Sequence, residues 1–154
     1  MKKLYILVIV LFVFTGCKKS STSENTIIGK WKITQELAIY YVNNVEVYRE
    51  ILALSGGANS YVEFKPDGSF ILNGSVNGSY ITYTGTYILT NNNTSLRTTI
   101  TGSSPGPDQL FTFVDNNTFT TSNTATGGGT TTYIKNGVNY TANGETVITT
   151  FVRF

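Results

Sequence analysis

The hydrophobic and polar positions of the chain alternate along most of its length. In one run, Trp31 and Ile33 point to one side of an extended chain, and Lys30 and Lys32 point to the other. This period of two is the pattern of a β-strand that has one side in a core and the other in water. Gly29, two residues before the tryptophan, leaves room for a bulky group to cross close to the backbone. The first strand is therefore predicted here.

Short groups of turn-forming residues separate the alternating runs. Asn43-Asn44, Pro66-Asp67-Gly68 and Asn136-Gly137 each stand between two β-prone segments, which predicts three hairpins. Gly85 interrupts a longer run and would let that strand bend, as barrels require. Residues 49–54 are compatible with one helical turn. The chain as a whole predicts eight to ten short strands.

The composition agrees with a sheet protein. Charged residues make up 13% of the 154 residues, and tyrosine and phenylalanine contribute ten and nine residues. Because β-branched and aromatic side chains favour strands, the fold class is all-β. Hairpin connections predict an antiparallel up-and-down meander, and its closure into a barrel would remove exposed edges. Residues 27–154 are long enough for one such domain.

The N-terminal residues have the pattern of an export signal. Lys2-Lys3 precede an apolar run over residues 4–14, followed by Thr15-Gly16-Cys17. A run of this length is too short for a membrane-spanning helix, which needs about 20 residues. It matches the hydrophobic region of a secretory signal peptide. The simplest alternative to the lipid attachment considered next is an ordinary secretory signal followed by an unmodified cysteine.

Residues 14–17 resemble the lipobox of bacterial lipoproteins, in which small residues precede a cysteine. The resemblance implies a signal peptide at residues 1–16, cleavage before Cys17 and acyl chains on Cys17. Residues 17–26 would then be a lipidated flexible tether, and several acyl chains would anchor the protein firmly to a membrane. Surface-exported lipoproteins of Bacteroidetes are expected to carry an acidic cluster after the cysteine. Only Glu24 is acidic here, which favours the periplasm-facing side of the outer membrane.

The charged and nucleophilic residues argue against several functions. Without Lys2 and Lys3 the chain is neutral, with no basic stripe, so no nucleic-acid partner is expected. Histidine is absent, which removes an imidazole base, a Ser–His pair and His-ligated metal. Glu36, Glu46 and Glu50 could form a carboxylate pair of the glycosidase type, but a solvated face is the simpler interpretation. We therefore expect a protein that is not an enzyme and holds no metal or cofactor.

Four segments carry a resemblance to a fold family. They are Gly29-Lys30-Trp31, the hairpin over residues 64–70, the strand over residues 85–89 and Phe151-Val152-Arg153. In this order they resemble the lipocalin-like domain of Bacteroidetes lipoproteins. In lipocalins a GxW motif on the first strand packs against an arginine near the end of the barrel. The resemblance thus implies that the Arg153 guanidinium covers Trp31 where the barrel closes, a contact that cation–π attraction would favour.

The same resemblance implies that a small apolar or amphipathic ligand binds inside an eight-stranded cup. The candidate lining residues are Tyr83, Tyr87, Phe111, Phe113, Phe119 and Tyr133. A simpler interpretation is that these rings fill the core. The alternative function is a non-enzymatic interaction module of the cell envelope, either a complex subunit or an inhibitor. Exposed tyrosines on the hairpin that carries Tyr40, Tyr41 and Tyr48 would then form the interface.

Overall fold

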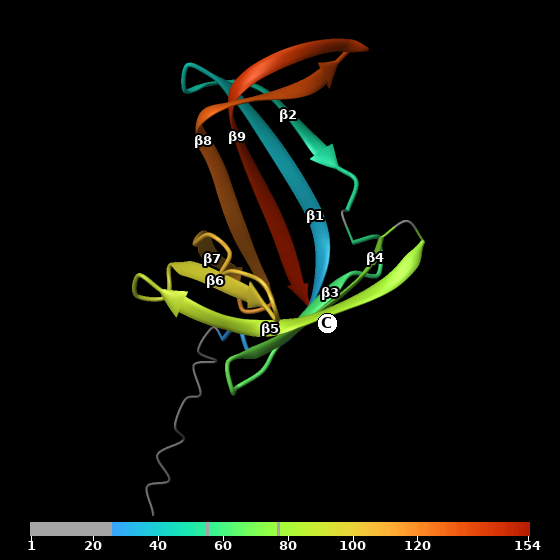
Figure 1. Cartoon of the computed structure of the whole chain (residues 1–154), viewed down its shortest axis with the longest axis vertical. Coiled ribbons are helices and arrows are strands. Elements are labelled where there is room, and N and C mark those ends of the chain that lie inside the picture. The colour runs from blue at the N-terminus through green and yellow to red at the C-terminus, as the bar shows by residue number, and fades with distance from the viewer. Residues whose placement is uncertain (1–25, 55, 77) are drawn as a thin grey trace, which may run out of the picture.

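The computed structural model describes residues 26–54, 56–76 and 78–154, and in these residues every regular element is a β-strand (Figure 1). Residues 1–25, which include the expected signal peptide and Cys17, lie outside the described residues, as do Ser55 and Asn77. The strands are β1 (Gly29–Val42), β2 (Val45–Leu52), β3 (Tyr61–Phe64), β4 (Ser69–Val76), β5 (Ser79–Thr90), β6 (Ser95–Ile100), β7 (Gln109–Asp115), β8 (Thr118–Lys135) and β9 (Val138–Arg153).

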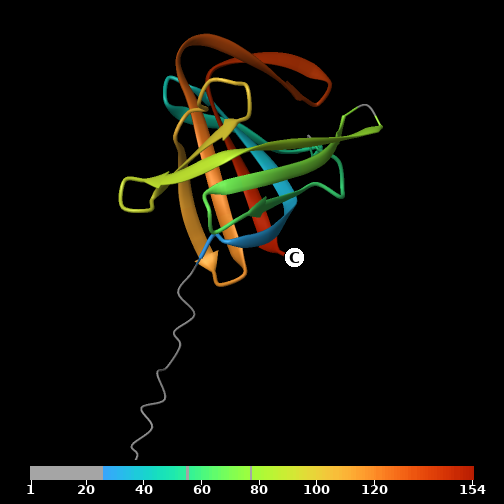
Figure 2. The ribbon, with the colours of Figure 1, turned by 60° about the horizontal axis from the view of Figure 1, so that its bottom comes forward.

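The strands form one antiparallel sheet that closes on itself (Figure 2). From β3 onward each strand pairs with the strand that follows it in the chain, and β9 returns to pair with β1. The lower part of β1, residues 29–32, pairs with β3, whereas residues 36–42 of the same edge pair with β2. Eight strands thus make the barrel and β2 is added beside it. The predicted all-β meander closed into a barrel is confirmed.

The predicted turns are present, and their dihedrals explain why these residues occupy them. Asn43 and Asn44 have φ of 53° and 64°, and Asn136 and Gly137 have φ of 54° and 77°. Two successive positive φ values are typical of the two-residue turns whose twist matches that of the flanking strands. Gly68, with φ of 81°, ends the turn that Pro66 begins. Asparagine and glycine adopt these conformations at low energetic cost.

The helical turn considered for residues 49–54 does not form. Arg49 to Leu52 are the second half of β2, where Arg49 is opposite Ile39 and Leu52 is opposite Glu36 of β1. Pairing with β1 satisfies the backbone groups of this segment along a ladder, so the sheet overrides a local tendency that a single turn of helix could not stabilise by itself.

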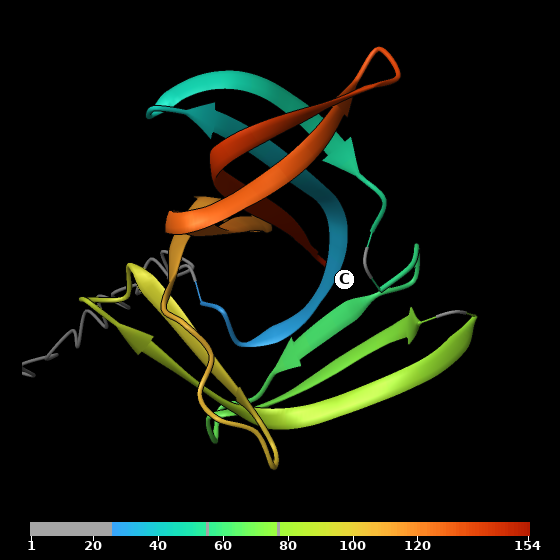
Figure 3. The ribbon, with the colours of Figure 1, turned by 45° about the horizontal axis from the view of Figure 1, so that its top comes forward.

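The far part of the β8–β9 hairpin bends across the β1–β2 pair (Figure 3). Its two strands pair from Thr118 and Val152 up to Lys135 and Val138, with one register shift between Thr126 and Thr131. Above the shift, Tyr133 is buried against Tyr40 and Tyr48, with ring centroids 4.9 and 5.1 Å away. The hairpin therefore covers the β1–β2 pair and forms a small second core there.

The main core fills the lower part of the barrel. Trp31 and Phe119 have no exposed surface, and their rings meet edge to face at 4.6 Å. Phe119 also stacks on Phe151 at 4.4 Å and contacts Phe111 at 5.1 Å. Aromatic pairs in such geometries stabilise beyond their buried area, by about 0.5–1.5 kcal/mol each. The sequence thus fills this end of the barrel with rings.

Candidate functional site

The end of the barrel at which β1 and β9 meet is sealed by Arg153. Its guanidinium lies 4.2 Å from the centre of the Trp31 ring, and the two residues are opposite each other in the β1–β9 ladder. The same group donates hydrogen bonds to the carbonyls of Thr26 and Ile28, at 2.9 and 3.2 Å. A planar guanidinium can lie flat on a ring and donate hydrogen bonds in its own plane, whereas an ammonium has no plane to stack. Arg153 therefore ties the N-terminal segment to the last strand.

The N-terminal segment also contributes to the seal. The Trp31 indole N–H donates a 2.6 Å hydrogen bond to the carbonyl of Ile27, and the Ile27 side chain is buried in the main core. The indole thus has a partner for its one polar group. The N-terminal segment thus covers the end of the barrel where β1 and β9 meet. A depression of about 340 Å³ remains beside it, lined by Thr26, Ile27 and Ile28 and by Tyr87, Phe111 and Phe113.

A bulge in β1 decides which residues line the barrel above the seal. Ile33 is opposite Phe151, but the next pairs are Gln35 with Thr150 and Glu36 with Thr149, so Thr34 is an extra residue. An extra residue reverses the alternation of the side chains that follow it. Glu36 therefore continues the inward face of Trp31 and Ile33.

The consequence is a sharp change of polarity between two neighbouring layers of the barrel. Across β1, β9 and β8 the lower layer is Ile33, Phe151 and Phe119, and the next one is Glu36, Thr149 and Thr121. The lower layer is apolar, and the upper layer offers one carboxylate and two hydroxyl groups. A molecule with an apolar body and a polar end would match this order.

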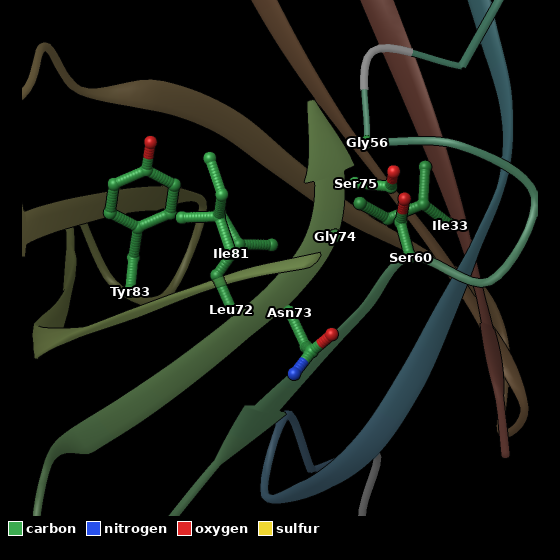
Figure 4. Close-up of a pocket in the computed structure, with 9 residues that line it drawn as sticks. All are labelled: Ile33, Gly56, Ser60, Leu72, Asn73, Gly74, Ser75, Ile81 and Tyr83. Carbon is green, nitrogen blue, oxygen red and sulfur yellow. The ribbon is translucent and has the colours of Figure 1, made fainter. Parts of the chain in front are cut away.

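Two adjoining cavities lie in this region. The first, of about 220 Å³, occupies the barrel interior and is bounded by the Glu36 layer and by rings of Phe64, Phe70 and Phe151. The second, of about 200 Å³, extends sideways between β4, β5 and the loop before β3 (Figure 4). Ile33 and Leu72 line both cavities. Each alone is smaller than the range of about 300–1,000 Å³ that is usual for small-molecule sites, so a ligand of usual size would have to occupy both.

The outer wall of the second cavity is a loop packed tightly on β4. The Ser75 N–H donates to the Gly56 carbonyl at 2.6 Å, and Ser60 donates through its hydroxyl to the Gly57 carbonyl at 2.6 Å. A side chain at Gly74 would lie 3.1 Å from the Gly56 Cα, so small residues are needed where the two backbones meet. The opposite wall, visible in Figure 4, is made by Leu72, Ile81 and Tyr83.

The six aromatic residues considered as ligand-lining are distributed over three places. Phe111, Phe113, Phe119 and Tyr87 belong to or pack on the main core, and Tyr87 donates its hydroxyl to the Lys65 carbonyl at 2.9 Å. Tyr133 lies in the second core. Tyr83, 39% exposed, is the member of the set that lines the second cavity. The structure thus brings four of the rings together, and separates Tyr83 and Tyr133 from them.

Several lining residues were not among the sequence-based candidates. Ile33 lies on the same face of its strand as Trp31, and Leu72 lies on the same face as Phe70. The period-two pattern of the sequence therefore indicates that both side chains point into the barrel. No such signal exists for Gly56, which reaches the cavity only because its loop folds onto β4, eighteen residues further along the chain.

Two of the three hairpin tyrosines, Tyr40 and Tyr48, pack against Tyr133 of the β8–β9 hairpin, whereas Tyr41 points to the outer face. Tyr40 is 5% exposed and stacks on Tyr48 at 6.2 Å, because the bulge turns Tyr40 to the face covered by the β8–β9 hairpin. Its hydroxyl donates to Glu50 at 2.9 Å. Burial, followed by this hydrogen bond and the nearby charges of Glu50 and Glu145, raises the pKa of Tyr40 to about 12. Tyr40 is therefore neutral at physiological pH.

Within the described residues, no group of three or more His, Cys, Asp or Glu side chains is arranged to hold a metal ion. The same residues contain no helix with the length and hydropathy that crossing a membrane requires. No family model, no curated protein and no solved structure matches the chain. The geometry of the barrel is therefore the basis for the functional argument.

Proposed function

We propose that this chain is a lipid-anchored binding protein of the bacterial cell envelope that takes a small hydrophobic or amphipathic molecule into its barrel. In this proposal it belongs with the lipocalin-like lipoproteins of Bacteroidetes, is attached to the outer membrane through acyl chains on Cys17, and faces the periplasm. It acts by binding, not by catalysis, and needs no nucleic acid, metal or cofactor.

The observation that carries the proposal is the pair of neighbouring cavities that share Ile33 and Leu72 as lining residues. A core filled only for stability would be expected to close such space, because each unfilled volume forfeits packing energy. Here the lower barrel is packed with rings, while the space above it stays open and mainly apolar. This contrast supports a binding role.

The layers of the barrel also support an orientation for the ligand. Its apolar part would lie against Ile33, Leu72 and Phe151, and its polar end would reach Glu36 and Thr149. Thr26, the first described residue, is held at the sealed end by Arg153. A tether that leaves from that end would place the membrane below the seal and the polar layer on the side away from it.

The test uses a substitution that fills the second cavity and a matched one that does not. Ile81 and Ile88 are on opposite faces of β5: Ile81 lines the cavity, whereas Ile88 is 51% exposed. We expect Ile81→Trp to reduce the fluorescence enhancement of the apolar probe N-phenyl-1-naphthylamine, with an affinity loss of about tenfold or more. Ile88→Trp is expected to leave binding unchanged.

Native mass spectrometry of the protein extracted from a bacterial envelope gives the second measurement. We expect a co-purifying molecule on the parent chain and on Ile88→Trp, and its loss from Ile81→Trp. The proposal is contradicted if both variants bind the probe equally well. It is also contradicted if the parent chain and both variants all fail to bind the probe. Thermal unfolding of each variant checks that a loss of binding is not a loss of folding.

A further inference from the structure

A separate depression lies on the outer side of the barrel wall, near the β1–β2 turn. Its volume is about 430 Å³. Tyr41 follows Tyr40 in β1, so its side chain points to the opposite face from the second core and from the cavities described above. The depression is lined mainly by one aromatic ring, amides and hydroxyl groups, from Tyr41, Asn43, Asn44, Asn143, Thr124 and Thr146.

Tyr41 has two neighbours across the sheet, Glu46 on β2 and Gly144 on β9, and it forms a platform because the neighbour on the side of the depression has no side chain. It is opposite Gly144 in the β1–β9 ladder, and a Cβ at that position would lie 3.5 Å from the Tyr41 Cβ and 3.9 Å from its ring. Since glycine stands there, the side of the ring stays open to the depression. The negative face of an aromatic ring attracts groups that carry partial positive charge, such as the C–H bonds of a sugar ring.

The polar groups around the platform are held in place by one another. The Asn43 backbone N–H donates to the Asn143 side-chain oxygen at 3.0 Å, and the Asn143 amide donates to the Asn43 side-chain oxygen at 3.2 Å. The hydroxyls of Thr124 and Thr146 are 2.9 Å apart. Each amide retains donor and acceptor capacity beyond these bonds. Preorganised groups of this kind lower the entropy lost when a ligand binds.

None of the residues that line the depression is charged. An anionic or cationic ligand would find no partner of opposite charge among them, and Glu46, which is opposite Tyr41 on β2, is already paired with Arg49. An apolar ligand would leave the amides without hydrogen bonds. A flat ring flanked by amides and hydroxyls matches a neutral molecule with both C–H faces and many hydroxyl groups. We propose that this depression is a binding site for neutral carbohydrate.

The proposal is independent of the ligand inside the barrel, and the chain offers a clean way to test it. Gly144 does not have a positive φ, and a Cβ there meets only ordinary van der Waals contacts, so Gly144→Val is compatible with the fold. Its side chain would occupy the space beside Tyr41. Tyr41→Ala removes the platform. Tyr80→Ala is the matched control, because Tyr80 is 73% exposed on β5 and does not line the depression.

Saturation-transfer NMR and calorimetry with maltotetraose, cellotetraose and tetraacetylchitotetraose provide the measurements. We expect at least one of these sugars to bind the parent chain and Tyr80→Ala at about millimolar concentration. Gly144→Val and Tyr41→Ala are expected to weaken that binding about tenfold or more, whereas Ile81→Trp leaves it unchanged. The proposal is overturned if no sugar in the panel binds, or if Gly144→Val, folded as judged by its thermal unfolding, binds as well as the parent chain.

Discussion

The guanidinium of Arg153 occupies the space that a side chain at Gly29 would need. A Cβ at Gly29 would lie 2.8 Å from Nη1 of Arg153, and the backbone at Gly29 has φ of 128°. The dihedral requires glycine, since other residues rarely adopt it, and a side chain there would also displace the guanidinium. Gly29 begins the first strand and Arg153 ends the last one, so their contact joins the two ends of the barrel domain.

Gly29→Ala is expected to lower the free energy of unfolding by about 2 kcal/mol or more, through backbone strain and displacement of the guanidinium. Gly102→Ala is the control, because Gly102 also has a positive φ, 83°, but has open space around it. Urea denaturation should show the larger loss at Gly29. In an Arg153→Ala background the part of the loss that comes from displacing the guanidinium should disappear, while the loss from backbone strain at Gly29 remains. An unchanged loss would mean that the two residues are not coupled.

The central position of Phe119 predicts a large effect of truncation. Its fully buried ring contacts Trp31, Phe111 and Phe151. Phe119→Ala is expected to lower the free energy of unfolding by about 3–5 kcal/mol, the usual range for a buried phenylalanine. Leu110→Ala on the neighbouring strand, where the side chain is 58% exposed, should change it by less than about 1 kcal/mol. Similar losses in the two variants would contradict the assigned core.

Tyr40 makes the stability of the protein sensitive to alkaline pH. Its pKa rises from 10.0 to about 12 on folding, so the folded state holds this proton more tightly than the unfolded state. Its contribution to stability is complete below pH 10 and is lost as the pH rises towards about 12. Denaturant unfolding across this window should show a smaller loss for Tyr40→Phe than for the parent chain.

The partner of Tyr40 gives an independent check by absorbance titration of the phenolates. Glu50→Gln removes the charge beside the Tyr40 hydroxyl and should lower the pKa of Tyr40, while burial still holds it above 10.0. Glu46→Gln is the control, because Glu46 pairs with Arg49 on the surface. An equal change of the titration curve in both variants would show that the Tyr40–Glu50 contact is not its cause.

Cys17→Ser tests the proposed anchor. Because a thioether needs the cysteine sulfur, the variant should lose incorporation of labelled fatty acid and move from the membrane fraction to the soluble fraction. Two or more acyl chains give stable attachment, so the parent chain should resist extraction by high salt. A parent chain without fatty acid would favour the alternative of an ordinary secretory signal.

Local chemistry explains which features could be predicted. Asn43-Asn44 and Asn136-Gly137 form turns through their own dihedral preferences, and Trp31 and Ile33 show their strand by alternation alone. The residues that line the second cavity could not be predicted in this way. Gly56 reaches it through a hydrogen bond to Ser75, and nothing near either residue in the sequence indicates that contact.

The sequence by itself determined most of the strands and the hairpin turns, because each depends on alternation or on the dihedral preferences of adjacent residues. Only the tertiary structure decided what lies inside the barrel above the seal. One bulged residue, Thr34, places Glu36 and Tyr40 on the inner face in place of their neighbours. Since a shift of one residue exchanges the two faces of a strand, the lining of the cavity depends on pairing between β1 and β9, which no local pattern encodes.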